Sequence, residues 1–316
     1  MVARETSTST PYTVEFRGLT RGKAAPPRAR FAGEASRYFV SLAHSSPTAA
    51  FGILVRALVG GGESSMDERK RERGWVPARR RVMGVAAVQA ALRAGEALQY
   101  VVLPRDGADR EALALAREAL ANGVEVMEVG PRKFERLRGN HSGTGILGLI
   151  GPAPIADLDQ VMTRGGAVWL LTGPAYPGNV GFAIRTAEVS GADGLYVDND
   201  FDHQGRRESR RASMRADRFM PVGWCAADAV LDAARSAGKH IVGIEDVGDR
   251  APWEAQLSGS VLLVVGAEAE GVPSAVLDAC DEVVRIPMGG FVASYNLQAA
   301  VAAIAVERFR QLETPS

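Results

Sequence analysis

The chain has 316 residues, enough for two domains, and its content of 46% apolar and 23% charged residues is typical of a globular α/β protein. Its longest apolar stretch is interrupted by polar residues, and its first residues lack the apolar segment of a secretory signal, so we expect no membrane association. The two cysteines, Cys225 and Cys280, lie far apart without the spacing of metal ligands, which favours a reducing cytoplasm and no metal site.

Charge is unevenly distributed along the chain, although 37 basic and 37 acidic residues cancel overall. Residues 1–81 hold 15 Lys and Arg against 7 Asp and Glu, whereas the remainder holds 22 against 30. A basic arm on a mildly acidic body indicates an anionic partner such as RNA. A solvated, disordered tail explains the same charge equally well.

Residues 1–80 are predicted to form a basic, poorly ordered extension, because they contain a Ser/Thr-rich start and the segments AAPPRAR and GGGESS. A short helix around Ala35–Leu58 is the one element expected there. From residue 81 a compact pattern begins, in which apolar strands alternate with helices that end at Gly95 and Gly123. This pattern predicts a small α/β domain over residues 81–151, followed by a Pro-punctuated linker over residues 152–164.

Residues 165–316 alternate strands and helices, which predicts a mostly parallel sheet covered by helices on both faces. The expected strands are AVWLLTG, GLYVD, RFMPVGW, KHIVGIE, SVLLVVG and EVVRIP, and the expected helices are Val180–Ser190, Ala226–Ala237, Pro273–Ala279 and Tyr295–Gln311. Ligands of such sheets bind beyond the carboxyl ends of the strands. We therefore expect a site formed by the loops GPAYPGN, GAEAEG and MGGFVASYN.

The first two loops carry residues suited to a ligand. Arg185 follows Asn179 on a predicted helix, and its planar guanidinium suits a phosphate, although a surface ion pair is the more frequent role of such an arginine. In the second loop Gly266 and Gly271 bracket two acidic residues, and glycines after a strand allow a ligand to approach the backbone. The loop matches neither a phosphate-binding loop nor a dinucleotide fingerprint. A ligand with a cationic centre or exposed ribose hydroxyls fits it better.

Two further features leave structural and functional interpretations open. Ser294 and Asn296 stand at the start of an Ala-rich helix, where such residues usually cap the backbone, although a bound ligand would account for the two glycines before them. The basic run over residues 206–215 forms a helix or a loop. It is either solvated surface or an RNA contact.

Three motifs, NVGFAIRTA, GAEAEG and IPMGGFVASYN, occur in this order, and with them the chain resembles the SpoU-type members of the SPOUT RNA methyltransferases. It is similar especially to the bacterial enzymes that methylate a guanosine ribose 2′-hydroxyl in large-subunit ribosomal RNA. The resemblance extends over about residues 81–311. The small domain resembles the ribosomal-protein-like RNA-binding domain that precedes the catalytic domain in these enzymes.

The resemblance implies a C-terminal domain with an α/β trefoil knot, S-adenosylmethionine as cofactor without a metal, and a homodimer joined through the knotted domain. The apolar last helix, Ala299–Phe309, would furnish part of that surface. Two sets of functional residues follow from it, and a third, for RNA contact, follows from the basic run over residues 206–215. The cofactor would be bound by Gly266, Gly271, Ile286, Met288 and Tyr295, catalysis would involve Arg185, Asn179, Glu268, Ser294 and Asn296, and RNA would contact Arg206, Arg207, Arg210 and Arg211. Arg185 would clamp a phosphate and polarise the 2′-hydroxyl, since an arginine is a poor proton acceptor.

The chain departs from the family pattern at three positions. Tyr295 stands where the family usually has Leu, Arg215 stands where it often has Gly, and His141 lies in an unusual segment and has no expected role beyond a structural one. The alternatives are a transfer RNA or antibiotic-resistance ribosomal RNA methyltransferase, and a catalytically silent RNA-binding or ribosome-assembly factor. A nucleotide-dependent oxidoreductase is disfavoured by the missing dinucleotide fingerprint.

Overall fold

The computed structural model of this protein describes residues 79–139, 145–292 and 294–313. The expected helix around Ala35–Leu58 and the segment with His141 lie outside the described residues. Among the described residues, no helix is both long and apolar enough to cross a membrane.

The small domain is an α/β unit with a four-stranded sheet in the order β1-β4-β2-β3. Strands β2 and β3 are parallel, and β4 is antiparallel to both β1 and β2. Each helix follows a strand, as the sequence predicts, and Asp109 caps α4 by accepting a hydrogen bond from the Ala112 N–H at 2.7 Å. Its elements are β1 (Arg80–Met83), α3 (Val85–Arg93), β2 (Leu98–Pro104), α4 (Arg110–Ala121), β3 (Glu125–Val129), α5 (Pro131–Arg138) and β4 (Leu147–Ile150).

The larger domain contains a six-stranded sheet in the order β10-β8-β9-β5-β6-β7, and every neighbouring pair in it is parallel. The central strands β5 and β9 are buried along their whole length, as their continuous apolar sequences require. The prediction of a parallel α/β domain is confirmed. Its strands are β5 (Ala167–Thr172), β6 (Gly194–Asp198), β7 (Val222–Trp224), β8 (His240–Ile244), β9 (Val261–Val265) and β10 (Glu282–Val284).

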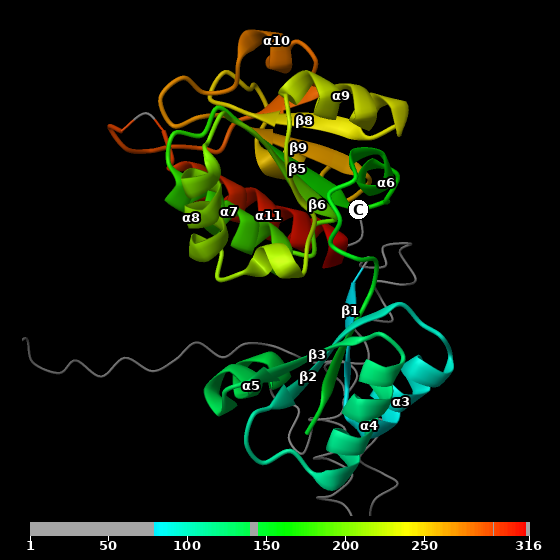
Figure 1. Cartoon of the computed structure of the whole chain (residues 1–316). Coiled ribbons are helices and arrows are strands. Elements are labelled where there is room, and N and C mark those ends of the chain that lie inside the picture. The colour runs from blue at the N-terminus through cyan, green and yellow to red at the C-terminus, as the bar shows by residue number, and fades with distance from the viewer. Residues whose placement is uncertain (1–78, 140–144, 293, 314–316) are drawn as a thin grey trace, which may run out of the picture. The chain divides into compact units, whose positions relative to one another are not determined.

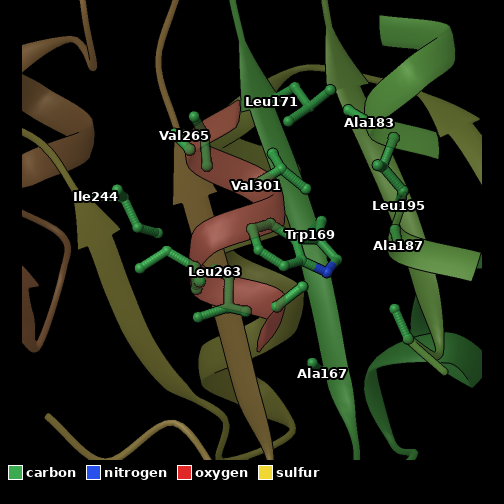
Figure 2. Packing of buried hydrophobic residues seen from close by; sticks show 14 of the residues in the cluster. Ala167, Trp169, Leu171, Ala183, Ala187, Leu195, Ile244, Leu263, Val265 and Val301 are labelled. Carbon is green, nitrogen blue, oxygen red and sulfur yellow. The ribbon is translucent and has the colours of Figure 1, made fainter. Parts of the chain in front are cut away.

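Helices cover both faces of this sheet (Figure 1). On one face α7 (Pro177–Val189) and α11 (Leu297–Glu313) pack side by side, with α8 (His203–Ala212) packed against α7. The other face is covered by α6 (Leu158–Met162), α9 (Ala227–Ser236) and α10 (Ser274–Leu277). Figure 2 shows how Trp169 of β5 and Leu263 of β9 lie around Val301 of α11 in the first of these layers. The trefoil knot that the resemblance implies stays a prediction.

The structure differs from the expected elements in two places. A short helix, α6, occupies part of the expected linker over residues 152–164. The strand expected over RFMPVGW is confined to β7, because Arg218 ends a 3₁₀ turn (η2, Ala216–Arg218) and Pro221 has no N–H for a sheet hydrogen bond. Arg215, at the position where the family often has Gly, takes a left-handed backbone with φ of 66°, which glycine adopts readily. The bend therefore survives the substitution.

Candidate active site

A pocket of about 370 Å³ opens at the carboxyl edge of the large sheet, where parallel α/β sheets bind their ligands. The loops after β8, β9 and β10 form its walls, and the start of α11 closes it. The lining residues from these segments that bear on function are Glu245, Asp246, Gly266, Glu268, Glu270, Gly271, Arg285, Ile286, Met288, Ser294 and Tyr295.

One of the three loops expected at the site does not line this pocket. We expected the loop after β5, but the loop after β8 lines the pocket instead. The reason is the strand order, which inserts β8 between β10 and β9 and therefore places its loop between theirs. The β5 loop still reaches the site indirectly, because the Asn179 side-chain amide at the start of α7 donates a hydrogen bond to the Glu268 carboxylate.

Tight backbone packing shapes the β9 loop. A Cβ atom on Gly266 would lie 2.0 Å from the carbonyl carbon of Gly271, so no other residue fits there without moving the loop. Ala267 and Gly271 are bridged by two backbone hydrogen bonds of 3.1 and 3.0 Å, and Gly271 has a φ of 68°. The loop thus folds back on itself as a hairpin whose main chain faces the pocket, as expected for a ligand held by backbone groups.

Glu245, which the sequence analysis missed, fastens this loop to β8. Its Oε2 accepts the Val272 N–H at 2.7 Å, and its Oε1 accepts the Asp246 N–H at 3.0 Å. A Cβ on Gly271 would lie only 2.5 Å from Glu245 Oε2, so the carboxylate fills the space that the glycine leaves. The available signal was an acidic residue directly after the buried strand sequence HIVGI, at the sheet edge where ligands bind.

The third loop separates the two roles expected together for Ser294 and Asn296. Asn296 caps α11, because its Oδ1 accepts the Gln298 N–H at 3.1 Å, but it does not line the pocket among the described residues. Ser294 lines the pocket and stands before the cap position. Tyr295 also lines it, and its ring finds room at the surface, where the hydroxyl donates to the Pro287 carbonyl oxygen at 3.1 Å.

Arg185 lies outside this pocket. It is exposed on α7 and, among the described residues, makes no hydrogen bond or ion pair. Phe182 and Val189 are exposed on the same helix at 46% and 71%. Their spacing of three and four residues from Arg185 puts all three on one face of α7. A single chain therefore does not bring the guanidinium to the pocket.

The two cysteines are free thiols, and no group of three His, Cys, Asp or Glu residues in the described part of the chain is arranged to hold a metal ion. Burial raises the pKa of the Cys280 thiol to about 11, with Asp281 adding to the shift. Burial also raises the pKa of Cys225. Both thiols therefore stay protonated near neutral pH, where a nucleophilic cysteine would need a lowered pKa.

Comparison with protein families matches both domains. Residues 167–306 match the model of the SpoU rRNA Methylase family, and residues 81–155 match a model described as RNA 2′-O ribose methyltransferase substrate binding. The large domain belongs to the SpoU methylase family. The SpoU motifs thus lie within residues 167–306, and the small domain carries the substrate-binding match.

Curated relatives extend over both domains. The chain is 26% identical over 237 residues to the 23S rRNA (guanosine-2′-O-)-methyltransferase RlmB of Photobacterium profundum, covering 73% of this chain and 97% of the relative. The enzyme of the same name from Escherichia coli strain K12 is 27% identical over 247 residues, covering 73% and 98%. An uncharacterized tRNA/rRNA methyltransferase of Mycobacterium ulcerans is 29% identical, covering 78% and 82%. Among solved structures, the SpoU methyltransferase AviRb from Streptomyces viridochromogenes in complex with AdoMet is 26% identical in sequence, with a TM-score of 0.46. The match covers 79% of this chain and 98% of that one.

The pocket residues of this SpoU protein fit the family's cofactor, S-adenosylmethionine. The volume lies within the roughly 300–1,000 Å³ of small-molecule sites. Four carboxylates and one arginine line it, a balance that suits the cationic sulfur and ammonium groups of the cofactor. Glu268 Oε2 is buried and has no hydrogen-bond partner among the described residues, and a buried acceptor of this kind requires a donor. A hydroxyl or ammonium group of the ligand would supply one.

Proposed function

We propose that this protein uses S-adenosylmethionine to methylate the ribose 2′-hydroxyl of a guanosine in 23S ribosomal RNA, and that it acts in the cytoplasm. The names of the Photobacterium and Escherichia relatives support this substrate, since both are matched along nearly their whole length. The substrate-binding match of the small domain supports an RNA substrate.

The observation that carries this proposal is the junction of Asn179 and Glu268 at the rim of the pocket. Two motifs that lie far apart in the sequence meet there, one after β5 and one after β9. The Gly266–Gly271 hairpin would offer main-chain groups to the adenosine part of the cofactor, and the unpartnered Oε2 of Glu268 would accept a hydrogen bond from a hydroxyl or ammonium group of the cofactor. We assign cofactor binding to Gly266, Gly271, Ile286, Met288 and Tyr295.

When bound, S-adenosylmethionine supplies a methyl group on a positively charged sulfur. Transfer would form a bond between the ribose 2′-oxygen and the methyl carbon, leave the electrons of the broken carbon–sulfur bond on sulfur, and release the hydroxyl proton to phosphate or water. Arg185 would clamp the adjacent phosphate and polarise the hydroxyl, because a guanidinium carries only hydrogen-bond donors and cannot accept the proton. Asn179, Glu268 and Ser294 would orient the ribose, while Asn296 fixes the start of α11.

A second copy of the chain would bring Arg185 to a pocket. Phe182 and Val189 of α7 and Val306 of α11 are exposed apolar residues on two helices that pack side by side, and such a patch favours burial against a partner. Arg185 lies between Phe182 and Val189 on the same face of α7, so a homodimer formed through α7 and α11 would bring its guanidinium to the partner chain. Phe182→Asp should give a monomer in sedimentation experiments and abolish methylation, whereas Leu120→Asp, at a still more exposed apolar position of the small domain, should leave the dimer intact.

Mapping of 2′-O-methyl groups tests the proposed function. Ribosomal and transfer RNA from cells with and without this gene would be compared nucleotide by nucleotide. We expect one guanosine of 23S ribosomal RNA to lose its ribose methyl group without the gene and to regain it with a plasmid copy. A lost mark on transfer RNA would refute the substrate, and unchanged marks on both RNAs would refute the enzymatic proposal.

A further inference from the structure

Helix α8 and the turn after it concentrate the positive charge of the large domain. Residues 203–218 contain six arginines against two acidic residues. The rest of residues 165–316 contains seven basic residues against 18 acidic ones. An anionic macromolecule that approaches this domain would therefore be attracted to one surface and repelled by most of the others.

Two of these arginines are held in place by an aromatic ring. The guanidinium groups of Arg206 and Arg210 lie 5.5 and 5.3 Å from the ring centre of Trp224, at the end of the edge strand β7. Arg206 also donates its Nε–H to the Phe201 carbonyl oxygen at 3.0 Å. Cation–π contacts of this kind fix side chains that would otherwise be mobile. The two arginines and Trp224 thus form a stack at the side of α8.

Arg207 and Arg211 follow these two arginines by one residue each and have the opposite character. Both are exposed, and among the described residues neither side chain makes a hydrogen bond or ion pair. They are four residues apart on α8, so they lie one turn apart on the same face. Their guanidinium groups are thus free to bind two phosphates of one strand.

The helix is fixed close to the edge of the sheet where the pocket opens. A Cβ on Gly181 of α7 would lie 2.4 Å from the Ala212 Cβ, so the backbones of α7 and α8 are in close contact. The loop before α8 is tied to the β5 loop, because the Asn199 side chain donates to the Pro174 carbonyl oxygen at 2.6 Å. The same β5 loop leads into α7, whose Asn179 bonds to Glu268 of the pocket.

We propose that the α8 face bearing Arg207 and Arg211, supported by the Arg206–Trp224–Arg210 stack, binds the phosphate backbone of the RNA substrate beside the methyl-transfer pocket. The inference rests on the proposed function only in taking RNA as the substrate. Contacts to phosphate position a nucleic acid without reading its sequence, so this face sets affinity and register rather than the choice of nucleotide.

The test compares Arg207→Gln/Arg211→Gln with a control, Arg235→Gln/Arg250→Gln, which removes the same charge from exposed positions elsewhere on the domain. The probe is a fluorescein-labelled transcript of a large-subunit ribosomal RNA domain, titrated over a KCl series. We expect the α8 variant to bind the RNA about tenfold more weakly than the wild type. The slope of log K plotted against log salt concentration should become shallower by about 1.4 to 1.8, as expected for two lost phosphate contacts. The control should match the wild type, and circular dichroism should show both variants folded.

Methylation measured on the same samples separates this inference from the proposed function. The α8 variant should raise the KM for RNA and leave kcat and the Kd for S-adenosylmethionine unchanged. An active wild type with an α8 variant of unchanged RNA affinity and salt slope would overturn the inference alone. An inactive wild type whose RNA binding depends on Arg207 and Arg211 would overturn the proposed function alone. Wild-type protein that binds phosphatidylserine vesicles but not RNA would overturn the assignment of RNA to this face.

Discussion

Removing the Glu245 side chain should loosen the loop that binds the cofactor. In Glu245→Ala the Val272 N–H loses a charged acceptor at 2.7 Å, and Val272 is only 5% exposed, so water replaces that acceptor poorly. A hydrogen bond to a charged group contributes about 1.5–3 kcal/mol. In the variant the cofactor itself would have to order the loop. The free energy that the hydrogen bond contributes in the wild type would then be lost from the free energy of cofactor binding. The Kd for S-adenosylmethionine should rise roughly 10- to 100-fold.

Two further variants separate this positioning role from simple charge attraction. Glu245→Gln keeps a side-chain oxygen that accepts the Val272 N–H, so it should bind the cofactor within about fivefold of the wild type. Asp246→Ala removes a carboxylate from the same pocket, but the Asp246 side chain does not hold the loop, and its Kd should change little. Isothermal titration calorimetry measures all of these constants directly.

The product S-adenosylhomocysteine, which lacks the charge on sulfur, provides the decisive comparison. Loss of loop positioning should weaken the binding of cofactor and product by the same factor in Glu245→Ala. Weakening of the charged cofactor alone would mean that Glu245 acts by electrostatic attraction. Equal losses in Glu245→Ala and Asp246→Ala, or an unchanged Kd in Glu245→Ala, would refute the positioning role.

Three other variants test separate parts of the site. Arg185→Ala should lower turnover by about 10²- to 10³-fold without changing the Kd for S-adenosylmethionine. Arg185→Lys should have equally low turnover, because a point charge cannot reproduce the planar fork of a guanidinium. A single-turnover assay measures turnover, and a titration measures the Kd. Asn179→Ala removes the amide donor to Glu268, which costs about 1–3 kcal/mol, so methylation under kcat/KM conditions should fall at least about fivefold while RNA affinity stays constant. In Cys225→Ser the one remaining thiol is Cys280, and its rate of reaction with iodoacetamide should rise with pH with a midpoint near its pKa of about 11. At pH 8 the reaction should be roughly 100-fold slower than that of a thiol with a pKa of 9.0, because fewer of the molecules carry a thiolate. The Cys280 thiol loses its proton at a lower pH in the unfolded chain than in the folded protein. The free energy of unfolding should therefore decrease as the pH rises from 9.0 towards about 11. A reaction midpoint near 9 would contradict the burial of Cys280.

The sequence predicted the elements of the large domain well wherever apolar patterns mark them. Strand β9, the run VLLVV, has an unmistakable signal, whereas α7 begins at Pro177, three residues before the expected start at Val180. Helix α8 lacks such a signal, because its buried residues are only Gly205 and Ser209. Small residues let it pack closely on α7, and a pattern of apolar periodicity does not detect contacts of that kind.

The location of the site was predicted better than its composition. Gly266, Ile286, Ser294 and Tyr295 all line the pocket, because their loops follow strands that end at the carboxyl edge. Glu245 was missed because the local sequence does not determine the order of the strands in the sheet. Only the order β10-β8-β9 places the β8 loop between the β9 and β10 loops. The local sequence also does not reveal that Arg185 lies outside the pocket of a single chain, and under the proposed homodimer a second chain would bring it to one.

The most direct test of the account is the identity of the methylated product. Purified protein, tritiated S-adenosylmethionine and unmodified 23S ribosomal RNA would be incubated, and the RNA digested to nucleosides and separated by chromatography. We predict that the label co-migrates with 2′-O-methylguanosine and disappears with Arg185→Ala. Label in a base-methylated nucleoside, or equal labelling by wild type and Arg185→Ala, would contradict the proposed chemistry.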